Sequence, residues 1–190
     1  MAELVLFQND QPWAGRKRKL TTTLILGLWL ALSACQPALN WRDISFDDQP
    51  GKGLLPCKPD RAERQVEWGE ARARLRMLGC EAQDMHFTWS RLDLPPEAAP
   101  AQVLRVWQQA SLSALGADPA LASKALEATV AGARLDVPPR QLQATSPSGT
   151  HAHFIWWVWG GQGHQMAVYS TRKPVSPATL QILREGIRLP

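Results

Sequence analysis

Two neighbouring stretches of the chain, 63–68 and 71–77, each follow a period of two on either side of Gly69-Glu70. A period of two is typical of a β-strand, and a short glycine-containing segment between two such stretches predicts a hairpin. With Gly69-Glu70 as a two-residue loop, Trp68 pairs with Ala71, and the rest of the register follows from that pair.

The same register sets two of the three arginines on the second strand against glutamates on the first. Glu67 lies opposite Arg72 and Glu63 lies opposite Arg76, and a cross-strand pair of opposite charge contributes roughly 0.2–1 kcal/mol. A phosphate-binding patch is the alternative for Arg72, Arg74 and Arg76. We favour a solvated, ion-paired face, because the glutamates are placed to neutralise the arginines.

A second hairpin is predicted from strands at 150–159 and 164–170, joined by the loop 160–163. With Trp159 opposite His164, one face carries Ile155, Trp157, Trp159, Met166 and Val168. The other face carries Phe154, Trp156, Val158, Ala167 and Tyr169. Because both faces are apolar, the hairpin is either central and covered on both sides, or it offers one face to a ligand or partner. The candidate ligand or partner face is formed by Trp157, Trp159 and Met166.

Three stretches carry helix signals. Residues 101–115 place apolar side chains at helical spacing and are followed by Gly116, a common stop signal. Asp118-Pro119 is typical of an N-cap followed by the first helical residue and opens a second helical stretch. Ser176-Pro177 has the same form, and the last helix is expected to bury a stripe formed by Leu180, Leu183 and Ile187.

The remaining segments complete the expected fold. Further strands are predicted at 41–46, 85–92 and 140–145. Residues 47–59, rich in Gly and Pro, are expected to form a loop, and 124–139 has no clear pattern. The order of strands, helix, strands and helix is typical of an α+β domain, in which helices pack on an antiparallel sheet. We therefore expect a single α+β domain over residues 41–190.

The N-terminal segment has a different character. Four consecutive cations, Arg16 to Lys19, precede an uncharged stretch from Leu20 to Ala34. As a helix this stretch would reach about 22 Å, short of the ~30 Å hydrocarbon core of a bilayer. A cationic region, a short apolar region and small residues at its end are typical of a secretory signal.

The end of this segment, Leu32-Ser33-Ala34-Cys35, resembles the lipobox of bacterial lipoproteins. The resemblance implies that residues 1–34 are a lipoprotein signal peptide, that Cys35 carries a diacylglycerol and an N-linked acyl chain such as palmitate, and that 35–40 form a short tether. Two or three acyl chains make membrane attachment stable, whereas one is marginal. In that family a residue other than Asp after the cysteine, here Gln36, implies transfer to the outer membrane.

The region before the apolar stretch departs from that family, because it is longer and contains Glu3 and Asp10. This departure suggests a start codon further downstream. An uncleaved anchor helix with an incidental cysteine is the alternative.

Removal of the signal changes the charge of the chain. The full sequence has 21 Lys and Arg and 17 Asp and Glu, of which residues 1–34 contain four and two. The mature chain keeps 17 basic and 15 acidic residues, a net charge of +2. No basic domain remains that would predict nucleic-acid binding.

With Cys35 used for lipid, Cys57 and Cys80 remain, and in an exported domain they predict one disulfide, because that compartment is oxidising. The hairpin register places them two positions out of line, so the chain has to bend at Pro56 and Pro59. Two free thiols or a metal pair are the alternatives, but no CxxC motif or nearby histidine supports a metal.

No pattern in the sequence predicts an active site. His151 and His153 share a strand face about 6.6 Å apart, but a catalytic zinc needs three ligands, and His164 is too distant in the predicted register. Gly160–Gly163 joins two strands, unlike a phosphate-binding loop, and no GxSxG motif is present. We expect no catalytic residue, no metal and no cofactor.

The order of elements adds a second resemblance. A lipobox, a strand hairpin, a helix, three strands with a wide hairpin and a terminal helix are similar to the DcrB/PsbP-like group of small exported domains. The resemblance spans residues 41–190 and implies an antiparallel sheet with helices on its faces. It implies no general catalytic residues.

Together these features predict a non-catalytic lipoprotein, anchored through Cys35 to the periplasmic face of the outer membrane, that binds or supports another envelope component, with an envelope protein as its expected partner. One alternative is a carrier of a small hydrophobic ligand, in which the Trp-rich hairpin lines a pocket. Another is a hydrolase with an unrecognised site.

Overall fold

The computed structural model describes residues 39–68, 71–132, 135 and 137–190. The predicted signal peptide, 1–34, and Cys35 lie outside these residues. None of the helices in the described part of the chain is both long and apolar enough to cross a membrane.

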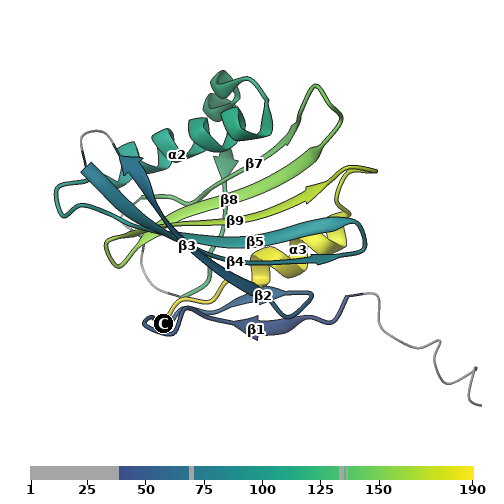
Figure 1. Ribbon diagram of the computed structural model, residues 1–190, viewed down its shortest axis with the longest axis horizontal. Coiled ribbons are helices and arrows are strands. Elements are labelled where there is room, and N and C mark those ends of the chain that lie inside the picture. The colour runs from purple at the N-terminus through teal and green to yellow at the C-terminus, as the bar shows by residue number, and fades with distance from the viewer. Residues whose placement is uncertain (1–38, 69–70, 133–134, 136) are drawn as a thin grey trace, which may run out of the picture. The chain divides into compact units, whose positions relative to one another are not determined.

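Within the described residues, seven strands form one antiparallel sheet in the order β3-β4-β5-β9-β8-β7-β6 (Figure 1). The strands are β3 (Asp60–Trp68), β4 (Ala71–Ala82), β5 (Met85–Asp93), β6 (Leu126–Glu127), β7 (Arg140–Thr145), β8 (His151–Trp159) and β9 (Gln162–Ser170). The meander β3-β4-β5 starts at one edge. The chain then crosses to the other edge and returns through β6, β7 and β8 to β9, which pairs with β5.

Different elements cover the two faces of this sheet (Figure 1). Helix α2 (Pro100–Leu115) lies on one face, contacts β8, and leads into the 3-10 helix η2 (Pro119–Lys124). Helix α3 (Pro177–Gly186) and a small sheet of β1 (Arg42–Ile44) and β2 (Gly53–Leu55) lie on the other face. The described chain is therefore a mixed α+β arrangement in which the sheet dominates, as the predicted fold class requires.

The core consists of two layers, one on each face of the central strands β8 and β9. The layer under α2 is built from Leu92, Val103, Leu104, Trp107, Phe154, Trp156, Val158 and Ala167. The layer under α3 and the small sheet is built from Phe46, Leu55, Phe87, Trp89, Ile155, Trp157, Met166, Val168, Leu183 and Ile187. A sheet whose central strands are apolar on both sides has to be covered on both sides, and here it is.

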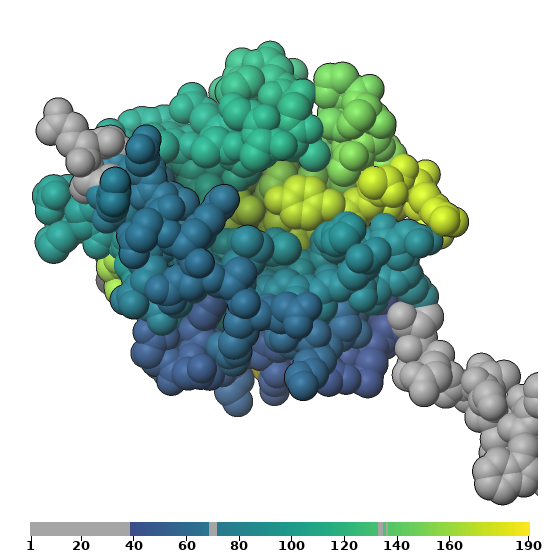
Figure 2. Space-filling model, viewed as in Figure 1, coloured from purple at the N-terminus to yellow at the C-terminus, as the bar shows by residue number. Residues whose placement is uncertain are grey.

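The first hairpin has the predicted register. β3 and β4 pair Trp68 with Ala71 and Glu63 with Arg76. β3 is nonetheless an edge strand, and most of its residues are exposed. In the space-filling view it lies on the surface that faces the viewer (Figure 2). Charged side chains along such an edge oppose edge-to-edge aggregation.

The predicted helix boundaries are confirmed. Gly116 ends α2 with a φ of 76°, in the left-handed region that glycine adopts without strain. The Ser176 side chain caps α3 by accepting a hydrogen bond from the backbone N–H of Thr179. Leu183 and Ile187 are buried as expected, whereas Leu180 is only partly buried.

The predicted pairing of Trp159 with His164 is wrong. Trp159 pairs with Gln162, and the turn consists of Gly160 and Gly161 alone, with φ of 60° and 70°. Two consecutive residues with positive φ form the two-residue turn whose twist matches that of the flanking strands, and glycine adopts it at no steric cost. The shift is two residues, so the predicted faces stay the same, but His164 moves opposite Trp157.

One further segment differs from the prediction. The expected loop 47–59 contains β2, because Leu55 is needed in the core and β2 pairs with β1. The stretch after Asp118 is helical as predicted and forms a 3-10 helix, which Asp118 caps by accepting a hydrogen bond from the N–H of Ala120. Its residues contribute no buried side chain that would hold a longer helix.

We predict that Leu183→Ala lowers the free energy of unfolding by about 2–5 kcal/mol, because it leaves a cavity where α3 packs on the sheet. Ile182→Ala is the matched control. Ile182 is 36% exposed and Leu183 only 1%, so the control should cost less than about 1 kcal/mol. Urea denaturation measures both, and equal losses would show that α3 does not pack in this way.

Candidate functional site

The candidate ligand face formed by Trp157, Trp159 and Met166 belongs to the core. Trp157 and Met166 are fully buried, and Trp159 packs partly buried against the same cluster. Of the two alternatives for this hairpin, the structure has the one in which both faces are covered.

Two surface hollows in the described part of the chain lie elsewhere. One, of about 390 Å³, is lined by His86, Ala114, Leu115, Thr150 and Tyr169. The other, of about 440 Å³, lies beside β3 and β4 and is lined by Phe46, Asp47, Asp48, Arg61, Ala62, Glu63, Arg76, Met77 and Leu78. Neither hollow is lined by the three residues of the candidate ligand face.

A buried arginine is the most unusual polar feature of the fold. The side chain of Arg91, on β5, has no exposed surface. Its two terminal nitrogens donate to the two oxygens of Asp48, each at 2.7 Å, in a bidentate pair. The ring of Phe46 lies 4.8 Å from the guanidinium carbon, so the arginine is enclosed by an aromatic face as well as by a carboxylate.

Further arginines and a second carboxylate extend this pair into a cluster. Arg76 donates to Asp48 at 2.8 Å and to Asp93 at 3.3 Å. Arg74 donates to Asp93 at 2.8 Å, and this hydrogen bond raises the pKa of Arg74. We define the arginine cluster as Arg74, Arg76, Arg91, Asp48 and Asp93. It carries three positive and two negative charges.

Strand geometry explains why these residues meet. Arg76 on β4 pairs with Arg91 on β5, and Arg91 pairs with His164 on β9. Trp157 on β8 completes this row across the sheet. The turn between β1 and β2 then brings Asp48 to the row.

His164 lies at the inner end of the row, among tryptophans. Its ring stacks on Trp157, with centroids 5.1 Å apart and planes 6° from parallel. Trp89 and Trp159 lie at 6.1 and 6.4 Å. Burial, only partly offset by the backbone of Trp159, lowers the pKa of His164 to about 3. Neither ring nitrogen has a hydrogen-bond partner of good geometry, so His164 is a neutral member of an aromatic cluster.

The other histidines do not form a metal site. Burial lowers the pKa of His153 to about 4, whereas His151 hydrogen bonds to Thr145 at 3.0 Å. His86, two residues after Asp84 in the chain, lies 3.9 Å from Glu81 instead. In the residues that the structure describes, no group of three or more His, Cys, Asp or Glu side chains is arranged to hold a metal ion.

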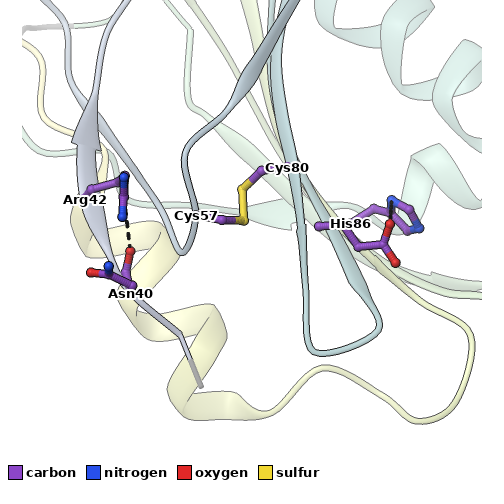
Figure 3. The surroundings of a disulfide bond; sticks show 6 residues. Asn40, Arg42, Cys57, Cys80 and His86 are labelled. Atoms are coloured by element: carbon purple, nitrogen blue, oxygen red, sulfur yellow. Dashed lines mark hydrogen bonds and ion pairs between the residues drawn. A yellow bond between two sulfur atoms is a disulfide. The ribbon is translucent and has the colours of Figure 1, made fainter. Parts of the chain in front are cut away.

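The predicted disulfide is present. Cys57 and Cys80 are bonded, with their Cα atoms 5.9 Å apart (Figure 3). The chain bends at Pro56 and Cys57, between β2 and β3, which brings Cys57 back to the position that the register alone leaves out of line. The bond joins the connection between β2 and β3 to β4.

The sequence interpretation missed the arginine cluster. Arg72, Arg74 and Arg76 were expected to form an ion-paired, solvated face. Arg74 and Arg76 are ion-paired, but their partners are Asp48 and Asp93 and not glutamates of β3, and the Arg76 side chain is largely buried. An available signal was the alternation Phe87, Trp89, Arg91, which places an arginine on the same strand face as two core aromatics.

Comparison with family models, curated proteins and solved structures finds no match for this chain.

We predict that acid destabilises this fold in part through His164. Its pKa lies below the ordinary value of 6.5, so protons bind preferentially to the unfolded chain. The contribution of His164 to stability is complete above pH ~6.5 and is lost as the pH falls. At pH 4 the loss lowers the free energy of unfolding by about 3 kcal/mol.

His164→Phe keeps an aromatic ring and should lose this part of the acid sensitivity. Urea denaturation between pH 7 and 4 measures the effect, and His86→Phe, at an exposed position, is the control. The interpretation fails if the two variants show the same dependence on pH.

We also predict that the double variant Cys57→Ser, Cys80→Ser unfolds with a free energy about 3 kcal/mol lower, because the unfolded chain regains the freedom of a loop of 23 residues. A reductant should bring the wild-type chain to the same stability and leave the variant unchanged. A wild-type chain whose unfolding midpoint ignores the reductant would contradict this.

Proposed function

We propose that this chain is a non-catalytic lipoprotein of a bacterial envelope, held by lipid on Cys35, whose α+β domain binds or supports another envelope protein. The observation that carries the proposal is the position of the Leu32–Cys35 motif, directly after an apolar segment and directly before the folded domain. β1 begins at Arg42. At about 3.5 Å for each extended residue, the tether keeps the domain within roughly 25 Å of the membrane surface.

The disulfide supports an exported location. Bonds between cysteines persist in oxidising compartments and are rare where thiols are kept reduced. The bond between Cys57 and Cys80 joins two parts of the folded domain, so folding itself brings these cysteines together. Gln36 after the modified cysteine supports the periplasmic face of the outer membrane as the destination.

The polar groups of the domain support binding rather than catalysis. Asp48 and Asp93 accept hydrogen bonds from arginines, and His164 is enclosed by tryptophans, with a pKa too low for acid–base chemistry near neutral pH. The likeness to the DcrB/PsbP-like group rests on the order of elements alone and stays a prediction.

We predict that Cys35→Ala abolishes lipidation and leaves the unprocessed precursor, because the modified sulfur is also the cleavage signal. Globomycin, which blocks cleavage of lipoprotein precursors, should have the same effect on the wild-type chain. Mass spectrometry of the purified protein detects the acyl chains, and Cys80→Ser, which keeps Cys35, is the matched control for loss of a cysteine.

The same strains test the binding role. Crosslinking in intact envelope should give a discrete adduct with the wild-type chain that is lost or weakened in Cys35→Ala. Normal maturation of Cys35→Ala would overturn the lipoprotein proposal, and a wild-type chain without any adduct would overturn the binding role.

A further inference from the structure

The pair between Asp48 and Arg91 is asymmetric in its exposure. The Arg91 side chain has no exposed surface, whereas the Asp48 side chain is 51% exposed. The carboxylate therefore lies at the outer end of a buried guanidinium, with solvent behind it. Removal of this carboxylate alone would leave the two terminal nitrogens of Arg91 as unpaired hydrogen-bond donors at the base of an opening to solvent.

The arginines of the cluster also have hydrogen-bond donors that no acceptor uses. The Nε atoms of Arg76 and Arg91 are buried and lack a hydrogen-bond partner, and Arg91 Nε reaches only an ion-pair distance of 3.6 Å from Asp93. Three guanidinium groups share two carboxylates. Native proteins satisfy most buried polar groups, and a purely structural ion pair gains from a full set of acceptors. The surplus of donors is what a site for an additional or exchanging anion provides.

The hollow of about 440 Å³ adjoins this cluster, because Asp48 and Arg76 line it. Its remaining wall combines a charged rim of Asp47, Arg61 and Glu63 with an apolar part formed by Phe46, Ala62, Met77 and Leu78. A molecule with an anionic head and an apolar body matches this combination of arginine donors and apolar wall.

Asp48 and its partners stand on different kinds of element. Arg91 and Arg76 stand on long strands of the seven-stranded sheet. Asp48 stands on the turn between β1 and β2, where the N–H of Gln49 donates to the carbonyl of Phe46. The residues of this turn belong to none of the paired strands, so an outward shift of Asp48 would break no backbone hydrogen bond of the large sheet.

We propose that Arg91 and Arg76 form a binding site for the carboxylate of an amphipathic ligand, and that Asp48 occupies this site from within the chain until such a ligand displaces it. A planar carboxylate matches the fork of an arginine in two parallel hydrogen bonds, as the carboxylate of Asp48 does here. The site does not depend on the lipid anchor.

The test compares Asp48→Ala with Asp43→Ala in the full chain, with the disulfide formed. Asp43 is the matched control, because it is a half-exposed carboxylate on β1 that pairs with the exposed Arg188 and does not line the hollow. Hexanoate is the probe, sodium chloride of equal ionic strength controls for screening, and hexan-1-ol controls for the apolar body. The readouts are the midpoint of thermal unfolding and the ¹⁵N resonances of the arginine Nε groups.

Asp48→Ala should bind hexanoate at least about tenfold more tightly than the wild-type chain, because the competing internal carboxylate is gone. Its unfolding midpoint should rise saturably with hexanoate and not with chloride or hexan-1-ol. Asp43→Ala should behave as the wild type, and adding Arg76→Gln to Asp48→Ala should weaken the response.

A folded Asp48→Ala variant with no saturable response to hexanoate would overturn the proposal, as would an equal response to hexan-1-ol. If Asp48→Ala folds only with hexanoate, the proposal is supported. If the variant folds neither with nor without hexanoate, the titration of the wild-type chain with hexanoate decides. Saturable shifts of the Arg76 and Arg91 Nε resonances support the site, and unchanged resonances overturn it.

Discussion

The central hairpin has large apolar side chains on both of its faces, and this constraint determines the rest of the fold. Trp156 and Phe154 point to one side of β8, and Trp157 and Ile155 point to the other. Neither side can be left in water at a tolerable cost, since each buried side chain of this size contributes roughly 1.5–3 kcal/mol. The chain therefore needs α2 for one face and α3 with the small sheet for the other.

The face of the sheet that α3 and the small sheet cover is not apolar throughout. Over most of that face the core is apolar, but at the end near the β1–β2 turn it changes to arginine, aspartate and histidine. A buried guanidinium such as that of Arg91 is tolerated only with a matched carboxylate, and that carboxylate comes from outside the main sheet. The stability of this end thus depends on one turn, and this is the place where we propose that an external carboxylate can replace Asp48.

Much of the architecture could be predicted from the sequence, because it follows from local rules. The register of the first hairpin, Gly116 at the end of α2 and Ser176 at the start of α3 each depend on a few neighbouring residues. The two cysteines could also be paired, because only two remain once Cys35 is assigned to lipid.

The arginine cluster could not be predicted, because it depends on contacts between distant segments. Asp48 and Arg91 are far apart in the chain, and nothing near either one marks the other as its partner. The error at Trp159 was of another kind. Four residues of glycine-rich sequence allow a loop or a tight turn, and only the pairing of Gln162 within the sheet distinguishes them.

The position of the disulfide has a mechanical consequence. The chain upstream of the domain enters at β1, which is paired only with β2, through three residue pairs. A load applied from that end would peel β1 away first and would then reach Cys57. There the covalent link transfers the force to Cys80 on β4, a strand that pairs with β3 over residues 71–79 and with β5 over residues 75–82. Tension on the N-terminal end is thus spread over the large sheet, where many hydrogen bonds resist it together rather than one after another.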